Sequence, residues 1–77
     1  MRSKFYTNAG ELKPYAYSCG YVSERMNSAT GTRVTLGMID GNVYRVITDS
    51  PRDGIFHKYF RTLTAARRWW RRALTIG

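Results

Sequence analysis

The chain has 77 residues, enough for one small domain with a thin hydrophobic core and too few to favour an enzyme with a large internal cavity. Hydrophobic residues make up 43% of it, which argues against a disordered chain. Thirteen Lys and Arg stand against five Asp and Glu, and the resulting net charge of +8 favours an acidic partner such as nucleic acid, an anionic membrane or an acidic protein surface.

Cys19 is the only cysteine, so neither an internal disulfide nor a cysteine-based zinc site can form. A small chain without disulfides suggests a reducing compartment, and we expect a cytoplasmic protein, in its own cell or in an infected host. No apolar run matches a signal peptide or a transmembrane segment. We therefore expect no membrane partner, and we expect a monomer.

Turn-forming residues and weak periodicity characterise the first part of the chain. We expect residues 1–10 to form a flexible arm, from which Phe5 and Tyr6 could dock on the core, and residues 11–77 to form a single domain. No repeat or low-complexity segment divides that domain further.

A short helix near residues 12–19 is favoured by its flanking residues. Pro14 suits the first turn of a helix, and Gly20 suits the position just after one. A single strand over 15–26 is the alternative, because Tyr and Val favour sheet. With the helix, a strand is expected at 21–26 and a loop at the following five residues.

The strongest local pattern is a β-hairpin, in which strands at 33–39 and 43–48 flank Asp40-Gly41. A two-residue turn would place Arg45 on the buried face. A three-residue turn with Gly41 in the left-handed conformation instead buries Val34, Leu36, Met38, Tyr44 and Val46. We favour the three-residue turn, which leaves the other face with Arg33, Thr35, Ile39, Val43, Arg45 and Ile47.

The remaining elements follow from turn and cap signals. Residues 49–54 are dense in turn formers, residues 55–60 form a strand, and Thr62 is the expected N-cap of a helix over 63–74. The predicted fold class is α+β, with a three- or four-stranded antiparallel sheet and the C-terminal helix packed on one face.

This C-terminal helix is amphipathic. At 100° per residue, one side carries Leu63, Ala66, Trp69, Trp70, Ala73 and Leu74. The opposite side carries Arg67, Arg68, Arg71 and Arg72. We expect the apolar side to pack on the sheet and the arginines to face water or a partner.

The arginine cluster is either a solvated face or a binding surface. Solvated helices usually mix acids with bases, whereas residues 63–74 contain no acid and their arginines repel one another. This pattern favours contact with phosphates or with an acidic protein groove, to which exposed aromatic rings could add stacking on unpaired bases. The candidate binding residues are Arg67, Arg68, Arg71, Arg72, Arg61, Lys58, Arg45 and Arg33.

Signals for catalysis are weak. His57 is the only histidine, and a hydrolase using Cys19 with His57 is the weakest hypothesis, because two single residues carry no spacing information. The sequence has no glycine-rich phosphate loop and no metal-ligand spacing. We expect no enzyme, no catalytic residue, no metal site and no cofactor.

Residues 33–74 resemble two kinds of DNA-binding domain. The stretch YRVITDSPRDGIFHKYFRTLTAARRWW is similar to the closing half of the plant ethylene-response-factor domain, and to the arm-type domain of tyrosine recombinases. The shared entry into the helix consists of Phe60, Thr62, Leu63, Ala65, Ala66 and Trp69. The resemblance implies a sheet face in the major groove, with Arg33, Thr35, Arg45 and Lys58 on DNA.

Two hypotheses about function follow. The first is a nucleic-acid-binding protein, for DNA or RNA, that uses the arginine face of the last helix. The second is a phage-encoded regulator that binds a host protein complex through the same surface. RNA polymerase, in transcription antitermination or inhibition, and a defence complex are its expected targets.

Overall fold

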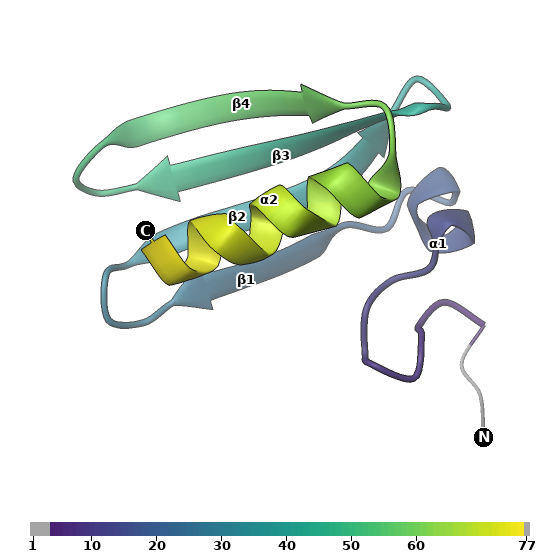
Figure 1. Ribbon diagram of the computed structural model, residues 1–77, viewed down its shortest axis with the longest axis horizontal. Helices are drawn as coiled ribbons and strands as arrows, with labels where there is room; N and C mark the ends of the chain where they lie inside the picture. The colour runs from purple at the N-terminus through teal and green to yellow at the C-terminus, as the bar shows by residue number, and fades with distance from the viewer. Residues whose placement is uncertain (1–3, 77) are drawn as a thin grey trace.

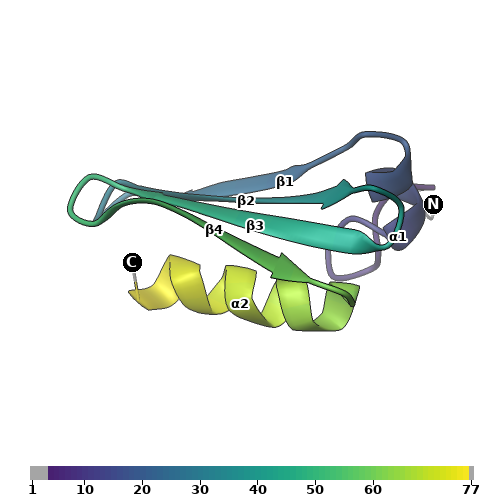
Figure 2. The ribbon, with the colours of Figure 1, turned by 90° about the horizontal axis from the view of Figure 1, so that it is seen from above.

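The computed structural model describes residues 4–76, so residues 1–3 of the expected arm lie outside the described residues. The elements, in order, are α1 (Pro14–Ser18), β1 (Ser23–Asn27), β2 (Thr32–Ile39), β3 (Val43–Ser50), β4 (Gly54–Phe60) and α2 (Leu63–Ile76). The strands form one antiparallel sheet in the order β1-β2-β3-β4, and α2 lies along one of its faces (Figures 1 and 2). The predicted α+β class is confirmed.

The first helix is short and has the expected flanks. Pro14 occupies its first turn, and Gly20, with a φ of 91°, follows its end. Ala16 and Tyr17 are buried, which ties this single turn to the core. The alternative of one strand over 15–26 is therefore wrong, because the first four of those residues are helical and β1 begins only afterwards.

The β2–β3 hairpin has the predicted three-residue turn. Leu36 pairs with Val46, and Ile39 pairs with Val43, so three residues close the turn. Gly41 has a φ of 80°, in the left-handed region that glycine adopts without strain. The predicted set of residues consequently faces α2, and Val34, Leu36 and Val46 are fully buried.

Helix α2 covers this apolar face. The N–H of Ala65 donates to Oγ1 of Thr62 at 3.3 Å, which makes Thr62 the N-cap as predicted. Ala66 and Trp70 are buried, and Nε1 of Trp70 donates to the backbone oxygen of Val34 at 3.1 Å. The small alanine allows close approach to the sheet, and the indole hydrogen bond fixes the helix against β2.

The segment before α1 folds back toward α2. The N–H of Lys13 donates to the backbone oxygen of Phe5 at 2.7 Å, and Tyr6 forms an isolated bridge with Leu12. Leu12 is buried in the core, and Phe5 packs against that core. This return of the chain places Glu11 next to α2, which matters for the arginines described below.

Candidate nucleic-acid interface

The candidate cations divide between the two faces of the sheet. Lys58 is in register with the buried Val46, so it points to the side on which α2 lies. Arg33 and Arg45 alternate along their strands with buried valines, and so they point to the uncovered face. A ligand on one face leaves the cations of the other face out of reach. The structure thus places Lys58 on the opposite face of the sheet from Arg33 and Arg45, with which the resemblance grouped it.

A single carboxylate engages two of the four helix arginines. Nε of Arg67 lies 2.9 Å from Oε2 of Glu11, and the guanidinium of Arg71 contacts Oε1 of the same side chain. Arg67 also donates to the backbone oxygen of Leu12. The side chains of Arg67 and Glu11 are only 18% and 16% exposed, so water screens this ion pair weakly.

The expectation that all four arginines face water or a partner is therefore wrong for Arg67. Its position explains why: it lies one turn from Leu63 and two turns from Leu74, at the border of the apolar side. The folded-back N-terminal segment covers this border. Nε of Arg67 has no hydrogen-bond partner within residues 4–76, so its contact with Glu11 is Coulombic attraction.

The same corner contains a buried phenol. Tyr17 is 3% exposed, and its hydroxyl shares a hydrogen bond of 2.9 Å with Oγ of Ser23. Burial raises the pKa of Tyr17, although Ser23 and the nearby Arg67 act in the opposite direction. A neutral phenol, a guanidinium and a carboxylate thus share this part of the core, which indicates a structural role for Arg67.

Arg68 and Arg72 differ from that pair. Both are exposed, as is Arg61, which precedes the N-cap of α2. Within the described part of the chain, no carboxylate is paired with any of these three arginines. Arg68 and Arg72 are four residues apart, so they lie on one side of the helix with a rise of about 6 Å between them. These arginines can meet an external anion without breaking an internal contact.

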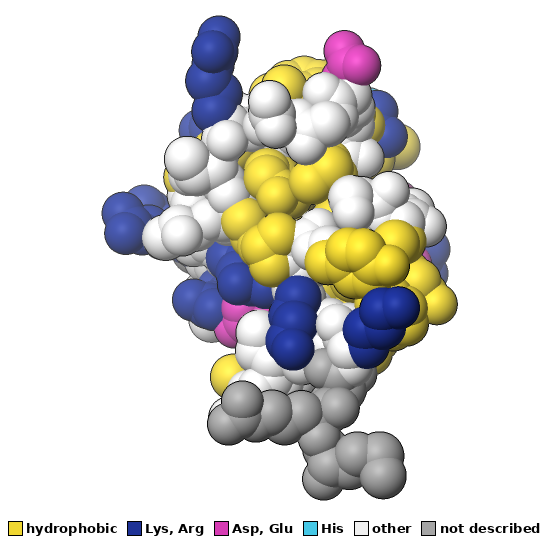
Figure 3. All heavy atoms as spheres, turned by 90° about the vertical axis from the view of Figure 1, so that its right-hand side faces the viewer, with side chains coloured by type: hydrophobic (Ala, Val, Ile, Leu, Met, Phe, Trp, Pro, Cys, Tyr) yellow, Lys and Arg dark blue, Asp and Glu magenta, His cyan; other side chains and the backbone are white. Residues whose placement is uncertain are grey.

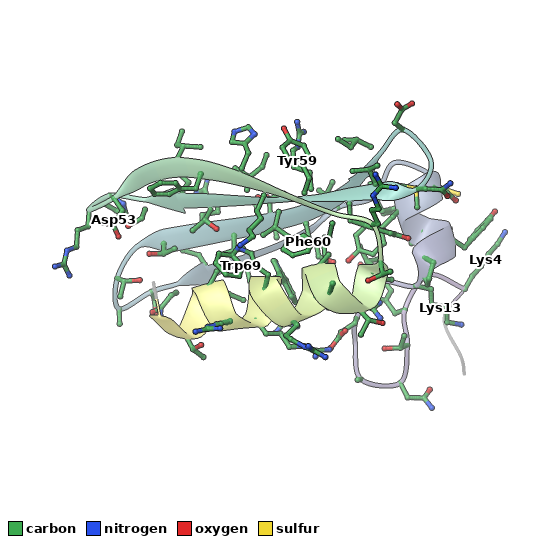
Figure 4. All side chains as sticks on the ribbon, turned by 45° about the horizontal axis from the view of Figure 1, so that its top comes forward. Lys4, Lys13, Asp53, Tyr59, Phe60 and Trp69 are labelled. Carbon is green, nitrogen blue, oxygen red and sulfur yellow. The ribbon has the colours of Figure 1, made fainter. Side chains whose placement is uncertain are left out.

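Two further cations lie over the tryptophans of α2. Nζ of Lys58 is 4.0 Å from the ring centre of Trp69, which lies between α2 and the sheet (Figure 4). The guanidinium of Arg25 is 5.4 Å from the ring centre of Trp70. Both distances are within the range of cation–π attraction. Sequence reasoning missed Arg25, whose side of β1 is fixed only by its register with the buried Val34.

The uncovered face of the sheet has mixed charge. Arg33 forms an ion pair of 3.1 Å with Glu24 and faces Asp49 across the β2–β3 pair. Arg45 lies in register with Tyr59, whose ring points away from α2, whereas Phe60 points toward it (Figure 4). Of the two arginines on this face, Arg33 is therefore the one accompanied by carboxylates.

Charge is also unevenly distributed along the chain. Residues 54–77 contain six Lys and Arg and no Asp or Glu, whereas residues 1–53 contain seven Lys and Arg and all five acids. The view onto the end of the molecule near α1 shows more Lys and Arg than Asp and Glu side chains, with hydrophobic side chains between them (Figure 3). The β4–α2 segment is thus the strongly cationic part of the protein, and Glu11 is the acid whose carboxylate pairs with arginines of α2.

Cys19 and His57 lie on different elements of the fold. Cys19 follows α1 and is exposed, and a hydrogen bond with it raises the pKa of Tyr15. His57 is exposed on β4. Within residues 4–76, no three His, Cys, Asp or Glu side chains gather where a metal ion could be held.

A groove of about 210 Å³ lies between β1, Trp70 and the N-terminal segment. Glu11 and Glu24 both line it, and each is already paired with arginine. The groove therefore offers no carboxylate without a cationic partner.

Comparison with known proteins gives no match: no family model, no curated protein and no solved structure is significantly similar to the chain. Neither of the two described helices combines the length and the apolar character that crossing a bilayer requires.

Proposed function

We propose that this protein binds nucleic acid through the exposed cations of β4, of α2 and of the connection between them. These residues, called the α2 basic surface below, are Arg61, Arg68, Arg72 and Lys58. The observation that carries the proposal is the exposure of three arginines without a paired carboxylate among the described residues, in a segment, residues 54–77, that has no acid of its own. The protein would act in the cytoplasm, which is the host cytoplasm if the chain is phage-encoded.

The expected mode is contact with the phosphate backbone. A guanidinium binds phosphate through a planar pair of N–H groups, and such contacts carry no sequence information by themselves. Each phosphate contact contributes about 0.9 to the slope of log affinity against log salt on duplex DNA. Three or four contacts give weak, strongly salt-dependent binding, in roughly the micromolar range typical of non-specific complexes.

A charge-matched pair of variants tests this proposal. Arg68→Gln/Arg72→Gln removes two charges from the α2 basic surface, and Arg33→Gln/Arg45→Gln removes two from the uncovered face. Fluorescence anisotropy with a labelled DNA duplex, and with single-stranded RNA of the same sequence, would measure affinity at several salt concentrations. We expect the first variant to lower the salt slope by about 1.8 and the affinity at least tenfold, and the second to change neither much.

The Arg33→Gln/Arg45→Gln control also gives a meaning to the other possible results. Equal losses in both variants would mean that net charge alone drives binding, and a loss only in Arg33→Gln/Arg45→Gln would move the site to the uncovered face. Either result contradicts the proposal. Thermal unfolding of both variants verifies folding. Arg33, Arg68 and Arg72 are exposed and Arg45 is half-buried, so we expect the Gln substitutions to change the free energy of unfolding by no more than about 1 kcal/mol.

An acidic protein surface is the second candidate ligand. A contact within the protein favours this candidate: Arg67 and Arg71 already bind a carboxylate, that of Glu11. In this case the partner is a host protein complex, such as RNA polymerase or a defence complex, and the protein is its regulator. Capture from a lysate with and without nuclease distinguishes the candidates, since only direct protein contact survives nuclease treatment.

A further inference from the structure

Strand β4 forms an uncovered edge of the sheet. It pairs with β3 on one side only, and α2 lies across β2, away from that edge (Figure 1). Residues 54–59 are all exposed, and only Phe60 is partly buried. An edge strand of seven residues presents unpaired N–H and C=O groups, which are a template for another strand.

This edge is unusually apolar for a surface strand. Ile55, Phe56 and Tyr59 are 62%, 58% and 55% exposed. Edge strands are commonly protected by proline, by a bulge or by outward lysines. Strand β4 contains no proline, and its only formally charged residue, Lys58, lies over the Trp69 ring. The strand therefore lacks the usual protection against pairing.

We propose that a second copy of this chain binds here, with the two β4 strands antiparallel about a two-fold axis through His57. A two-fold axis perpendicular to the sheet leaves each side chain on the same face of the sheet in both copies. Two residues that pair across the axis are therefore an even number of positions apart in the sequence. Only the register centred on His57 pairs all seven residues of β4. A register centred on Lys58 is shorter and also places two ammonium groups face to face, which is destabilising.

The pairs in this register are complementary. On the uncovered face, Ile55 lies opposite Tyr59 of the second copy, and this pair occurs twice because of the symmetry. A β-branched side chain and an aromatic ring are a favourable cross-strand pair. On the α2 side, Phe56 lies opposite Lys58 of the second copy. The three most exposed apolar side chains of β4 thus all gain a partner.

The symmetry has a consequence for the α2 basic surface. A two-fold axis perpendicular to the sheet places both α2 helices on the same face of one continuous eight-stranded sheet. The hydrophobic core lies within one chain, so we expect the association to be reversible and to depend on concentration. Each copy carries a net charge of +8, which opposes pairing, and salt should therefore strengthen the dimer by screening this repulsion.

Disulfide trapping tests both the pairing and its register. In a Cys19→Ser background, which removes the exposed natural thiol, His57→Cys places two thiols opposite each other. Their Cα atoms would be about 4.5–5.5 Å apart, within the range of a disulfide. In the same background, Ile55→Cys is the matched control, because the two copies of residue 55 are offset by four positions, or about 13 Å.

We expect a covalent dimer from His57→Cys alone, and from Ile55→Cys mixed with Tyr59→Cys, but not from either of these two alone. Sedimentation of the unmodified chain should show its mass rise with concentration and with salt. A chain that stays monomeric at all concentrations would overturn the proposal. Equal crosslinking at residues 55 and 57 would overturn it too, because random collision then explains the dimers.

Discussion

Glu11 is the residue that decides which of the four arginines of α2 are available to a partner. A single carboxylate neutralises part of two guanidinium groups, so the cluster of four becomes an exposed pair and an internally engaged pair. Because Arg67 is only 18% exposed, removing its partner leaves a cation that is poorly solvated. The same removal frees Arg71, which is 58% exposed, to meet an external ligand.

Glu11→Gln should therefore have two opposite effects. We expect the free energy of unfolding to fall by about 1–3 kcal/mol, the usual cost of a polar group left without its buried partner. We expect binding to nucleic acid to become tighter, because one negative charge is lost and Arg71 is released. Urea denaturation and fluorescence anisotropy measure the two effects, and unchanged stability would show that the ion pair is dispensable.

Among the elements, the β2–β3 hairpin sets which face of the sheet is buried. A turn one residue shorter would exchange the faces of β3 and bring Arg45 under α2. Gly41 permits the longer turn through its positive φ of 80°. A Cβ at this position would meet no atom within 4 Å, so the cost of a side chain is conformational and not steric.

Gly41→Ala should accordingly lower the free energy of unfolding by about 1–2 kcal/mol, the penalty for an alanine in the left-handed region. For a domain of this size, about 1 kcal/mol corresponds to a fall in Tm of roughly 4–8 °C. Asn42→Ala is the control in the same turn, because Asn42 is exposed and its φ is not positive. Thermal unfolding of both variants checks this prediction, and equal losses would contradict it.

At the scale of the whole molecule, the two proposals differ in their response to salt. Nucleic-acid binding releases counterions and weakens as salt increases. Pairing of two copies with a charge of +8 each strengthens as salt increases, because screening reduces their repulsion. Raising NaCl from 50 mM to 200 mM, which is about a fourfold change in ionic strength, should lower the affinity for duplex DNA at least tenfold while increasing the dimer fraction.

Anisotropy and sedimentation in the same buffers measure these two trends. Arg68→Gln/Arg72→Gln serves as the control, since it should flatten the first trend and leave the direction of the second unchanged. Parallel trends in the parent protein would contradict at least one of the proposals, and the disulfide-trapping result would then identify which one.

The sequence by itself determined the local structure of this protein. The hairpin turn at Gly41, the N-cap at Thr62 and the apolar side of α2 follow from φ preferences, hydrogen bonding within a few residues and periodicity, all of which are local. The excess of positive charge in residues 54–77 is likewise a property of composition.

Only the tertiary structure decided which arginines are available to a partner. Glu11 lies far from Arg67 in the chain, and their contact depends on how the N-terminal segment folds back across α2. The faces of Arg25 and Lys58, and the exposed edge of β4, depend in the same way on strand pairing. Periodicity orders side chains around one element, whereas an ion pair between distant elements depends on packing that no local pattern records.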